Sequence, residues 1–335
     1  MKSFVVRTVI SVGFLCLLFY LMRGNIPDIL TALKGIDQTR LLLAVFISLT
    51  AVLIIARRLK LIFVADNIPM RFVESVNLTF IGCFFNNFLP TSVGGDIVKA
   101  MCAARITGHP VKSVTSVLMD RLFGLFTFIA IPSVSFVFFL KGSENPVVPV
   151  LIYSFLAAAL FSFFLLFNRN VARRFRFVEG LLNRFHLGEK IRKVYDGLHN
   201  FKNHKAVIAQ AMLLSVVGQV VSVWALYLMA RALGATAPMV YFFLLVPVVH
   251  LISMLPSLNG LGIREGAYVY FLAPHIGAHN AAALGVLFLA LLFLQSIIGG
   301  VIYALSPRYH VSFKRSRYEK NTRHPWTEPE SARKA

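Results

Sequence analysis

The sequence predicts an all-α fold: a polytopic integral membrane helix bundle with two inverted repeats, each containing a broken re-entrant helical hairpin. Three observations predict it. Hydrophobic residues make up 57% of the chain and charged residues only 14%, a composition unlike that of soluble domains. Apolar runs of about 20 residues, the length that spans a bilayer, recur along the chain. Two further apolar segments are interrupted by proline and glycine.

The uninterrupted apolar runs are each long enough to form a spanning helix. They lie near residues 4–22, 41–63, 114–140, 148–167, 207–231 and 281–305. The first run has no clear small-residue cleavage site, so we expect it to be retained as a helix rather than removed as a signal peptide. With the interrupted segments, these runs form one transmembrane domain over residues 1–305. A basic tail over 306–335 follows, and its polar composition predicts disorder.

The distribution of basic residues predicts how the chain is oriented. Residues 57–71 carry four basic residues against one acid, residues 168–206 carry ten against three, and the tail carries eight against three. The four in the first of these segments are Arg57, Arg58, Lys60 and Arg71. Since cytoplasmic loops are rich in Lys and Arg, these segments and both termini are predicted to lie on the cytoplasmic side of a bacterial inner membrane. Apolar and basic residues also intersperse at helical spacing over 168–206, which predicts interfacial helices that attract anionic lipid.

Residues 72–106 and 239–274 are the two interrupted segments. In each, an apolar run stops at Leu-Pro, crosses small polar residues and glycines, and restarts beside charged residues. Proline breaks a helix and glycine lets the chain reverse, so each segment is predicted to return to the side it entered. The orientation then puts the mouth of the first hairpin on the cytoplasmic side and that of the second on the outer side. Such paired breaks are typical of the central site of a transporter.

The hairpin tips are predicted to hold an anion such as a lipid phosphate. A helix that restarts inside the membrane directs N–H groups and the positive end of its dipole there, and Lys99 and Arg264 could add charged donors. Asp96 and Glu265 are expected to cap the restarted helices, which is compatible with ligand binding. The predicted substrate-binding residues are Asn87, Pro90, Ser92, Gly94, Gly95, Asp96, Lys99, Asp120, Arg121, Pro256, Asn259, Gly260, Gly262, Arg264 and Glu265.

Asp120 and Arg121 are adjacent charges within an apolar run. Burying either charge at the bilayer centre costs roughly 2.5–3.5 kcal/mol on insertion scales, so each needs a partner. Adjacent helical residues do not face each other, and the partners must therefore come from other elements. The candidates are Lys99 or Arg264 for Asp120, and Asp96 or Glu265 for Arg121. The pair would serve either substrate binding or the locking of helices.

The motifs around the two breaks occur in a characteristic order. They are NFLPTSVGGDIVKA (87–100), SVLMDR (116–121), LP (255–256) and GLGIRE (260–265). This set resembles the flippase-like family, which includes the transmembrane module of lysylphosphatidylglycerol synthases, over about residues 5–305. The resemblance implies a protein that flips or transports a phospholipid or an isoprenoid-type lipid. It also implies functional roles for Pro90, Gly95, Asp96, Lys99, Asp120, Arg121, Pro256, Gly262 and Glu265.

Neither an enzyme activity nor a cofactor or metal site is predicted. The chain contains no HExxH, P-loop or Gly-x-Ser-x-Gly motif. Only about thirty residues follow the last apolar run, so we expect the aminoacyltransferase domain of the bifunctional synthases to be absent. The chain has 34 Lys and Arg against 14 Asp and Glu. In a mostly apolar chain this balance favours anionic lipids as partners and argues against nucleic acid.

Two other functions stay open at this point. One is an intramembrane glycosyltransferase that uses a lipid-phosphate sugar donor, with Asp28 or Asp37 as a catalytic acid in an outer loop. The other is a non-catalytic membrane subunit that organises a lipid-synthesis complex, with a lipid-synthesis enzyme as its partner. The sequence leaves the identity of the lipid, the direction of transport, its energy coupling and the oligomeric state open.

Overall fold

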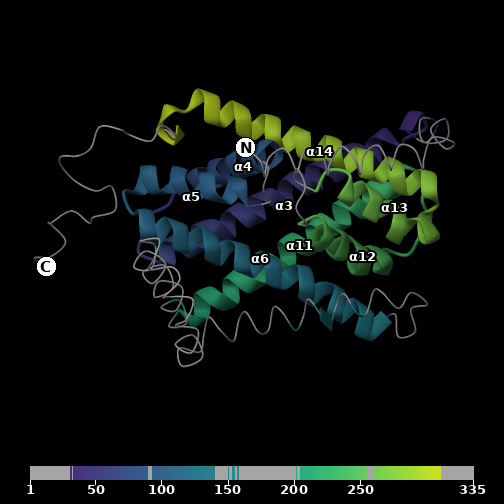
Figure 1. Cartoon of the computed structure of the whole chain (residues 1–335), viewed down its shortest axis with the longest axis horizontal. Helices are drawn as coiled ribbons and strands as arrows, with labels where there is room; N and C mark the ends of the chain where they lie inside the picture. The colour runs from purple at the N-terminus through teal and green to yellow at the C-terminus, as the bar shows by residue number, and fades with distance from the viewer. Residues whose placement is uncertain are drawn as a thin grey trace, which may run out of the picture.

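The computed structural model describes residues 33–89, 93–139, 204–254 and 260–310 and a few isolated positions (Figure 1). This part of the chain is helical throughout and has no strand, so the predicted all-α class is confirmed for it. The helices are α3 (Gln38–Ala65), α4 (Phe72–Phe88), α5 (Gly94–Thr107), α6 (Pro110–Phe139), α11 (Lys205–Ala232), α12 (Met239–Ile252), α13 (Ile263–Ile276) and α14 (Ala278–Leu305), followed by the 3-10 turn η3 (Pro307–Tyr309).

Four of these helices, α3, α6, α11 and α14, are long and apolar enough to cross a membrane. They have 28 to 30 residues, which at 1.5 Å per residue is about 42–45 Å. Large apolar side chains such as Phe46, Leu213 and Ile297 are more than 60% exposed, as expected for surfaces that face lipid. The predicted spans near 4–22 and 148–167 lie outside the described residues, as do nearly all of the 168–206 loop and most of the tail.

The remaining helices form two short pairs, which we call the first helix pair (α4 and α5) and the second helix pair (α12 and α13). Their lengths are 17, 14, 14 and 14 residues, below the ~20 residues of a spanning helix. Within each pair the two helices pack against each other. Both breaks fall inside the predicted interrupted segments. The tips, residues 90–92 and 255–259, lie outside the described residues, and with them the predicted site residues Pro90, Ser92, Pro256 and Asn259.

The first helix pair starts and finishes at one end of the bundle, which we call the Tyr309 end. There the Lys112 ammonium, near the start of α6, donates a hydrogen bond to the backbone oxygen of Asp66, just after α3 (3.2 Å). Cys102 of α5 donates to the backbone oxygen of Tyr309 (3.1 Å), and Asn77 of α4 donates to the Tyr309 hydroxyl (3.2 Å). The beginning of α4 and the end of α5 therefore lie beside the ends of α3 and α14.

The second helix pair starts and finishes at the opposite end, which we call the Gly277 end. There the Asp37 N–H, just before α3, donates to the backbone oxygen of Ala232 at the end of α11 (3.0 Å). Tyr241 near the start of α12 stacks on His275 near the end of α13, with ring centroids 3.9 Å apart. The two helix pairs thus lie toward opposite ends of the long axis of the molecule (Figure 1).

Packing relations in the two halves of the described chain correspond. Helix α4 packs on α14 as α12 packs on α6, and α5 packs on α6 as α13 packs on α14. Likewise α3 packs on α4 as α11 packs on α12, while α3 and α11 pack on each other. These relations are preserved when α3–α6 are exchanged for α11–α14. Each half therefore consists of a long helix, a short helix pair and a second long helix.

Glycines serve different purposes at the two breaks. A Cβ atom on Gly95 would collide with the backbone oxygen of Gly82 and lie 2.6 Å from Asn86 Oδ1, so α5 can start against α4 only with glycine there. At the second break Gly260 and Gly262 have φ angles of 76° and 82°. L-residues rarely adopt these angles, and here the glycines let the chain reverse into α13. The sequence predicted glycine-assisted reversal at both breaks, whereas at Gly95 close packing is the reason.

Candidate functional site

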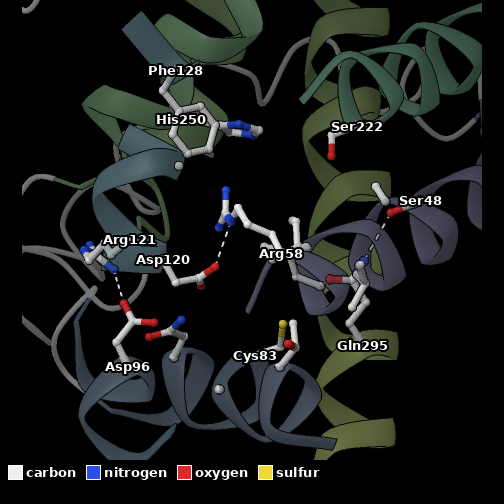
Figure 2. Close-up of a pocket in the computed structure, with 18 of the residues that line it drawn as sticks. Ser48, Arg58, Cys83, Asp96, Asp120, Arg121, Phe128, Ser222, His250 and Gln295 are labelled. Carbon is white, nitrogen blue, oxygen red and sulfur yellow. Dashed lines mark hydrogen bonds and ion pairs between the residues drawn. The ribbon is translucent and has the colours of Figure 1, made fainter. Parts of the chain in front are cut away.

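Two adjoining cavities lie between the helix pairs. Their volumes are about 330 Å³ and about 240 Å³. Both are lined by Asn86 of α4, Arg121 of α6, His250 of α12 and Phe288 of α14, and we call the two together the hollow. Figure 2 shows its polar side chains pointing inward from several helices. The hollow therefore lies where residues from both halves of the chain meet.

Asp120 is the central acid of the hollow. Its Oδ1 accepts a hydrogen bond from Arg58 Nε at 2.7 Å, and its Oδ2 lies 3.3 Å from Lys99 Nζ. Arg58 also donates to the Ser215 hydroxyl of α11 at 2.7 Å. Asp120 is 3% and Arg58 5% exposed, so this charge pair is removed from solvent. The predicted pairing of Asp120 with Lys99 is confirmed.

Arg58 corrects the sequence analysis, which counted it among the cytoplasmic basic residues of 57–71. It is buried in α3, whereas the neighbouring Arg57 is exposed. The two point to different sides because consecutive helical residues are about 100° apart. Because Arg58 is buried and paired with an acid, it should not be counted among the loop charges. The other three basic residues of the segment still outnumber its single acid, so the predicted orientation does not change.

Lys99 connects Asp120 to a second ion pair. Its Nζ also lies 3.3 Å from Asp96 Oδ1, and the other oxygen of Asp96 pairs with the Arg121 guanidinium. The predicted pairing of Arg121 with Asp96 is thereby confirmed. We call Arg58, Asp96, Lys99, Asp120 and Arg121 the ion network. It joins α3, α5 and α6 (Figure 2).

The ion network lies deep along its helices. Asp120 follows the first residue of α6 by ten positions, about 15 Å at 1.5 Å per residue. Lys99 precedes the last residue of α5 by eight positions, about 12 Å. Because both helix ends belong to the Tyr309 end, the network lies well inside the bundle.

Arg264 and Glu265 bring a further pair of charges from the second helix pair. Their side chains are 3.0 Å apart and each is 5% exposed. Glu265 also accepts the Gly262 N–H at 2.6 Å, so it caps α13 as predicted. The Arg264 guanidinium lies 5.1 Å from the centroid of the Phe288 ring, a cation–π distance. Arg264 lines the smaller cavity together with Arg121.

The second helix pair also contributes aromatic groups at the hollow, namely His250, which lines it, and Tyr268, which contacts His250. His250 stacks on Phe288 with centroids 5.3 Å apart and meets Phe128 edge-on at 5.6 Å. Its Nε2 lies within hydrogen-bonding distance of the Tyr268 hydroxyl, at 3.3 Å. Tyr268 follows the first-turn acid of α13 by three positions, as Lys99 follows that of α5. Corresponding positions of the two halves thus carry different chemistry.

Other predicted site residues are uncharged and hold together the helices that surround the hollow. Asn87 lines the smaller cavity, donates to the Leu292 oxygen at 3.1 Å and contacts the Ser296 hydroxyl, which ties α4 to α14. Gly94 and Gly95 are buried at the start of α5. The Gly95 N–H donates to Asn86 Oδ1 at 2.8 Å. This N–H, which the sequence analysis offered to an anion, is therefore already paired.

Sequence reasoning missed the polar side of the hollow opposite Asp96. Gln295 of α14 donates to the Ser48 hydroxyl of α3 at 3.1 Å, and both line the larger cavity (Figure 2). Each is a polar residue in an otherwise apolar run, and such residues often face a bundle interior. Applying that criterion to every run would have identified both residues.

Comparisons with known proteins agree with this architecture. Residues 4–299 match the family described as the lysylphosphatidylglycerol synthase transmembrane region. A UPF0104 membrane protein of Methanothermobacter thermautotrophicus is 28% identical over an alignment of 303 positions, and the match covers 83% of this chain and 86% of that protein. No solved structure matches the chain. The family match covers both helix pairs and all residues that line the hollow. The chain is an integral membrane protein and belongs to the lysylphosphatidylglycerol synthase transmembrane-region family.

Proposed function

We propose that this protein moves a lipid between the two leaflets of its membrane and binds the anionic headgroup in the hollow between the helix pairs. The observation that carries this proposal is the ion network, in which three cations and two acids line a cavity of about 330 Å³ inside an apolar bundle. Buried charges are costly in a membrane and generally mark a path for a polar substrate. The family membership supports a role in lipid handling.

The proposal includes a mechanism of alternating access. We take the two helix pairs as re-entrant hairpins that enter the membrane from opposite faces and belong to inverted repeats. Two observations support this reading, namely the corresponding packing relations of the two halves and the location of the pairs at opposite ends of the bundle. In transporters built this way, one repeat rocks against the other around a fixed site. The headgroup would then cross while its acyl chains stay in lipid.

We assign the headgroup site to both helix pairs and to α6. Asp96, Lys99, Asp120, Arg121 and Arg264 supply the charges, with Arg121 and Arg264 in the smaller cavity. Residues of the two tips remain predicted contacts. The basic residues near the Tyr309 end favour the cytoplasm for that end, and we propose a bacterial inner membrane as the location.

The contacts of Asp37 do not support the alternative function as a glycosyltransferase. Its carboxylate accepts the Arg40 N–H at 3.0 Å and pairs with the Arg40 side chain at 3.2 Å. This arrangement is an ordinary N-terminal helix cap, so α3 stability accounts for the residue. Asp28 lies outside the described residues.

The proposal is tested by reconstituting the purified protein into liposomes that contain a fluorescent phospholipid. A membrane-impermeant reductant bleaches only the outer leaflet, so bleaching beyond about half of the signal measures lipid movement. We expect movement with the wild-type protein and with the exposed-site control Arg57→Gln. We expect its loss in Arg121→Gln and Asp120→Asn. Movement that is equal in all four proteins, or absent from the wild type, would contradict the proposal. Turnover of a lipid-phosphate sugar donor would favour the enzyme instead.

A further inference from the structure

The larger cavity has a second polar side, which carries amide and hydroxyl groups. Ser48 of α3, Ser222 of α11 and Gln295 of α14 line it, and Figure 2 shows them across the cavity from Asp96 and Arg121. We call Ser48, Ser222 and Gln295 the neutral wall. Ser48 and Gln295 are only 8% and 7% exposed, so they are shielded from the outer surface of the bundle.

The neutral wall lies at a different depth from the ion network. Helices α3 and α11 run antiparallel and are joined where Arg58 donates to the Ser215 hydroxyl. Ser48 precedes Arg58 by ten positions, about 15 Å along α3. Ser222 follows Ser215 by seven positions, about 10 Å along α11. Both displacements lead toward the Gly277 end, so the larger cavity extends lengthwise from the ion network to the neutral wall.

The neutral wall keeps unused hydrogen-bonding capacity of both kinds. Gln295 Nε2 donates to Ser48 Oγ at 3.1 Å. Within the described part of the chain, the Gln295 amide oxygen accepts no hydrogen bond and the Ser48 hydroxyl donates none. The Ser222 hydroxyl likewise bonds to no described residue, although a helical serine can donate to the preceding turn. An acceptor and two hydroxyl groups therefore remain for a ligand.

Gln219 extends this pattern between the neutral wall and the ion network. It lies four positions after Ser215 and three before Ser222, so all three share one face of α11. Gln219 is 7% exposed, and its Nε2 has no hydrogen-bond partner among the described residues. Buried amide groups are normally paired, and leaving one unpaired is unfavourable. This face of α11 is thus better suited to a polar ligand than to helix packing alone.

We infer that the hollow binds a headgroup in two parts: an anionic phosphate at the ion network and an uncharged, hydroxyl-rich group, such as a cyclitol or a sugar, at the neutral wall. This inference rests on the proposed function and names the substrate class of the same site. A hydroxyl both donates and accepts, so several hydroxyls satisfy an amide oxygen and serine hydroxyls together. A charged group at the wall would be buried without an opposite charge. An apolar group would leave the wall unpaired.

The test measures binding to the purified full-length protein in detergent by native mass spectrometry. Two lipids with identical dioleoyl chains and the same charge compete: phosphatidylinositol, whose headgroup is rich in hydroxyls, and phosphatidylethanol, whose headgroup has none. We expect phosphatidylinositol to be preferred by at least about tenfold, because phosphatidylethanol leaves the neutral wall unpaired. Equal or stronger binding of phosphatidylethanol would overturn the inference. Competition by soluble glycerophosphoinositol as strong as that of the lipid would overturn the lipid as the source of the bound group.

Two variants assign the preference to the neutral wall. Ser222→Ala breaks no hydrogen bond of the described structure, so we expect an unchanged Tm, and Gln295→Leu replaces the amide by an apolar group of similar size. Each should lower the preference for phosphatidylinositol by about fivefold and leave the binding of phosphatidylethanol unchanged. Gln210→Leu is the matched control, because Gln210 is exposed on α11. A preference that both variants retain in full would overturn the inference. The wild-type ranking needs no variant, so the inference can be refuted even where Gln295→Leu does not fold.

Failure of this inference can be separated from failure of the proposed function. The liposome assay is run with fluorescent phosphatidylinositol and phosphatidylethanol in parallel. Equal movement of both lipids refutes recognition of the hydroxyls while lipid transport stands. Selective binding of phosphatidylinositol without movement of any lipid refutes transport while recognition of the hydroxyls stands.

Discussion

The Arg58–Asp120 pair allows a quantitative prediction about the interior of this bundle. The change Asp120→Asn keeps the size of the side chain and removes its charge. Arg58 and Lys99 then face a neutral amide, although both are at most 6% exposed. Ser215 still accepts one hydrogen bond from Arg58, and Asp96 still pairs with Lys99. The Arg58 charge has no such second acid among the pairs described above, so its burial is the main cost.

The magnitude follows from the burial of both partners. Removing one member of a buried ion pair costs about 3–5 kcal/mol, so the free energy of unfolding of Asp120→Asn should fall by about that much. Arg58→Met removes the cation instead and leaves Asp120 paired with Lys99 alone, so we expect a somewhat smaller loss. In the double variant neither charge is stranded. The two losses should therefore be less than additive by about 2 kcal/mol or more, within the range of direct contacts.

The measurement is a double-mutant cycle with the purified protein in mixed micelles. Unfolding is driven by an increasing fraction of a denaturing detergent and followed by helical circular dichroism. Arg57→Met is the matched control because Arg57 is exposed on the same helix, and a surface change of this kind stays within about 0.5 kcal/mol. Two results together would place the pair at the level of exposed ion pairs: a fall in the free energy of unfolding below about 1 kcal/mol for Asp120→Asn, and losses of the two single variants that add up in the double variant. It would refute the burial argument.

Three further predictions concern other parts of the structure. Gly95→Ala should destabilise the protein by about 1–3 kcal/mol through overpacking against α4. Gly266→Ala, where an added Cβ meets nothing within 4 Å, is the control and should be neutral or stabilising by about 0.5–1 kcal/mol. Equal Tm values for the two glycine variants would contradict this prediction. Tyr309→Ala removes a fully buried ring and should cost about 3–5 kcal/mol; an unchanged Tm would show that η3 does not hold the Tyr309 end together. Burial raises the pKa of the Asp66 carboxyl, partly offset by Lys112, so the native state binds its proton more tightly than the unfolded state. Stability should therefore fall as pH rises from the ordinary Asp pKa through the raised one, and Asp66→Asn should remove this slope; a slope that persists in the variant would assign it to another group.

Sequence patterns predicted the features of this fold that depend on length and on chain-breaking residues. Four of the six long apolar runs coincide with α3, α6, α11 and α14, because a spanning helix has to cover the bilayer with apolar residues. The other two runs lie outside the described residues. The interruptions at 89–93 and 253–262 fall where the sequence places Leu-Pro and glycine. At the second interruption, Gly260 and Gly262 have positive φ angles. Gly95 shows the limit of this reasoning, since its need for glycine comes from Gly82 on another helix. A sequence pattern alone does not reveal such tertiary contacts.

The site was predictable where a charge had few plausible partners. Asp120 and Arg121 required partners inside the membrane, and the few charges available left two candidates for each. The structure selects Lys99 for Asp120 and Asp96 for Arg121. Arg58 was missed because a neighbouring arginine made it look like part of a basic loop. The aromatic cluster around His250 was not predictable, because its rings come from separate helices and phenylalanine is abundant throughout the chain.

The most direct test of lipid passage through the hollow is an experimental structure of the purified protein with bound phosphatidylglycerol. The account predicts headgroup density between the two helix pairs, with its phosphate in contact with Arg121 and Arg264 and its acyl chains leading out to the lipid-facing surface. Two observations together would contradict it: lipid density only on the outer faces of α3 and α14, and an ion network whose members contact one another and no lipid.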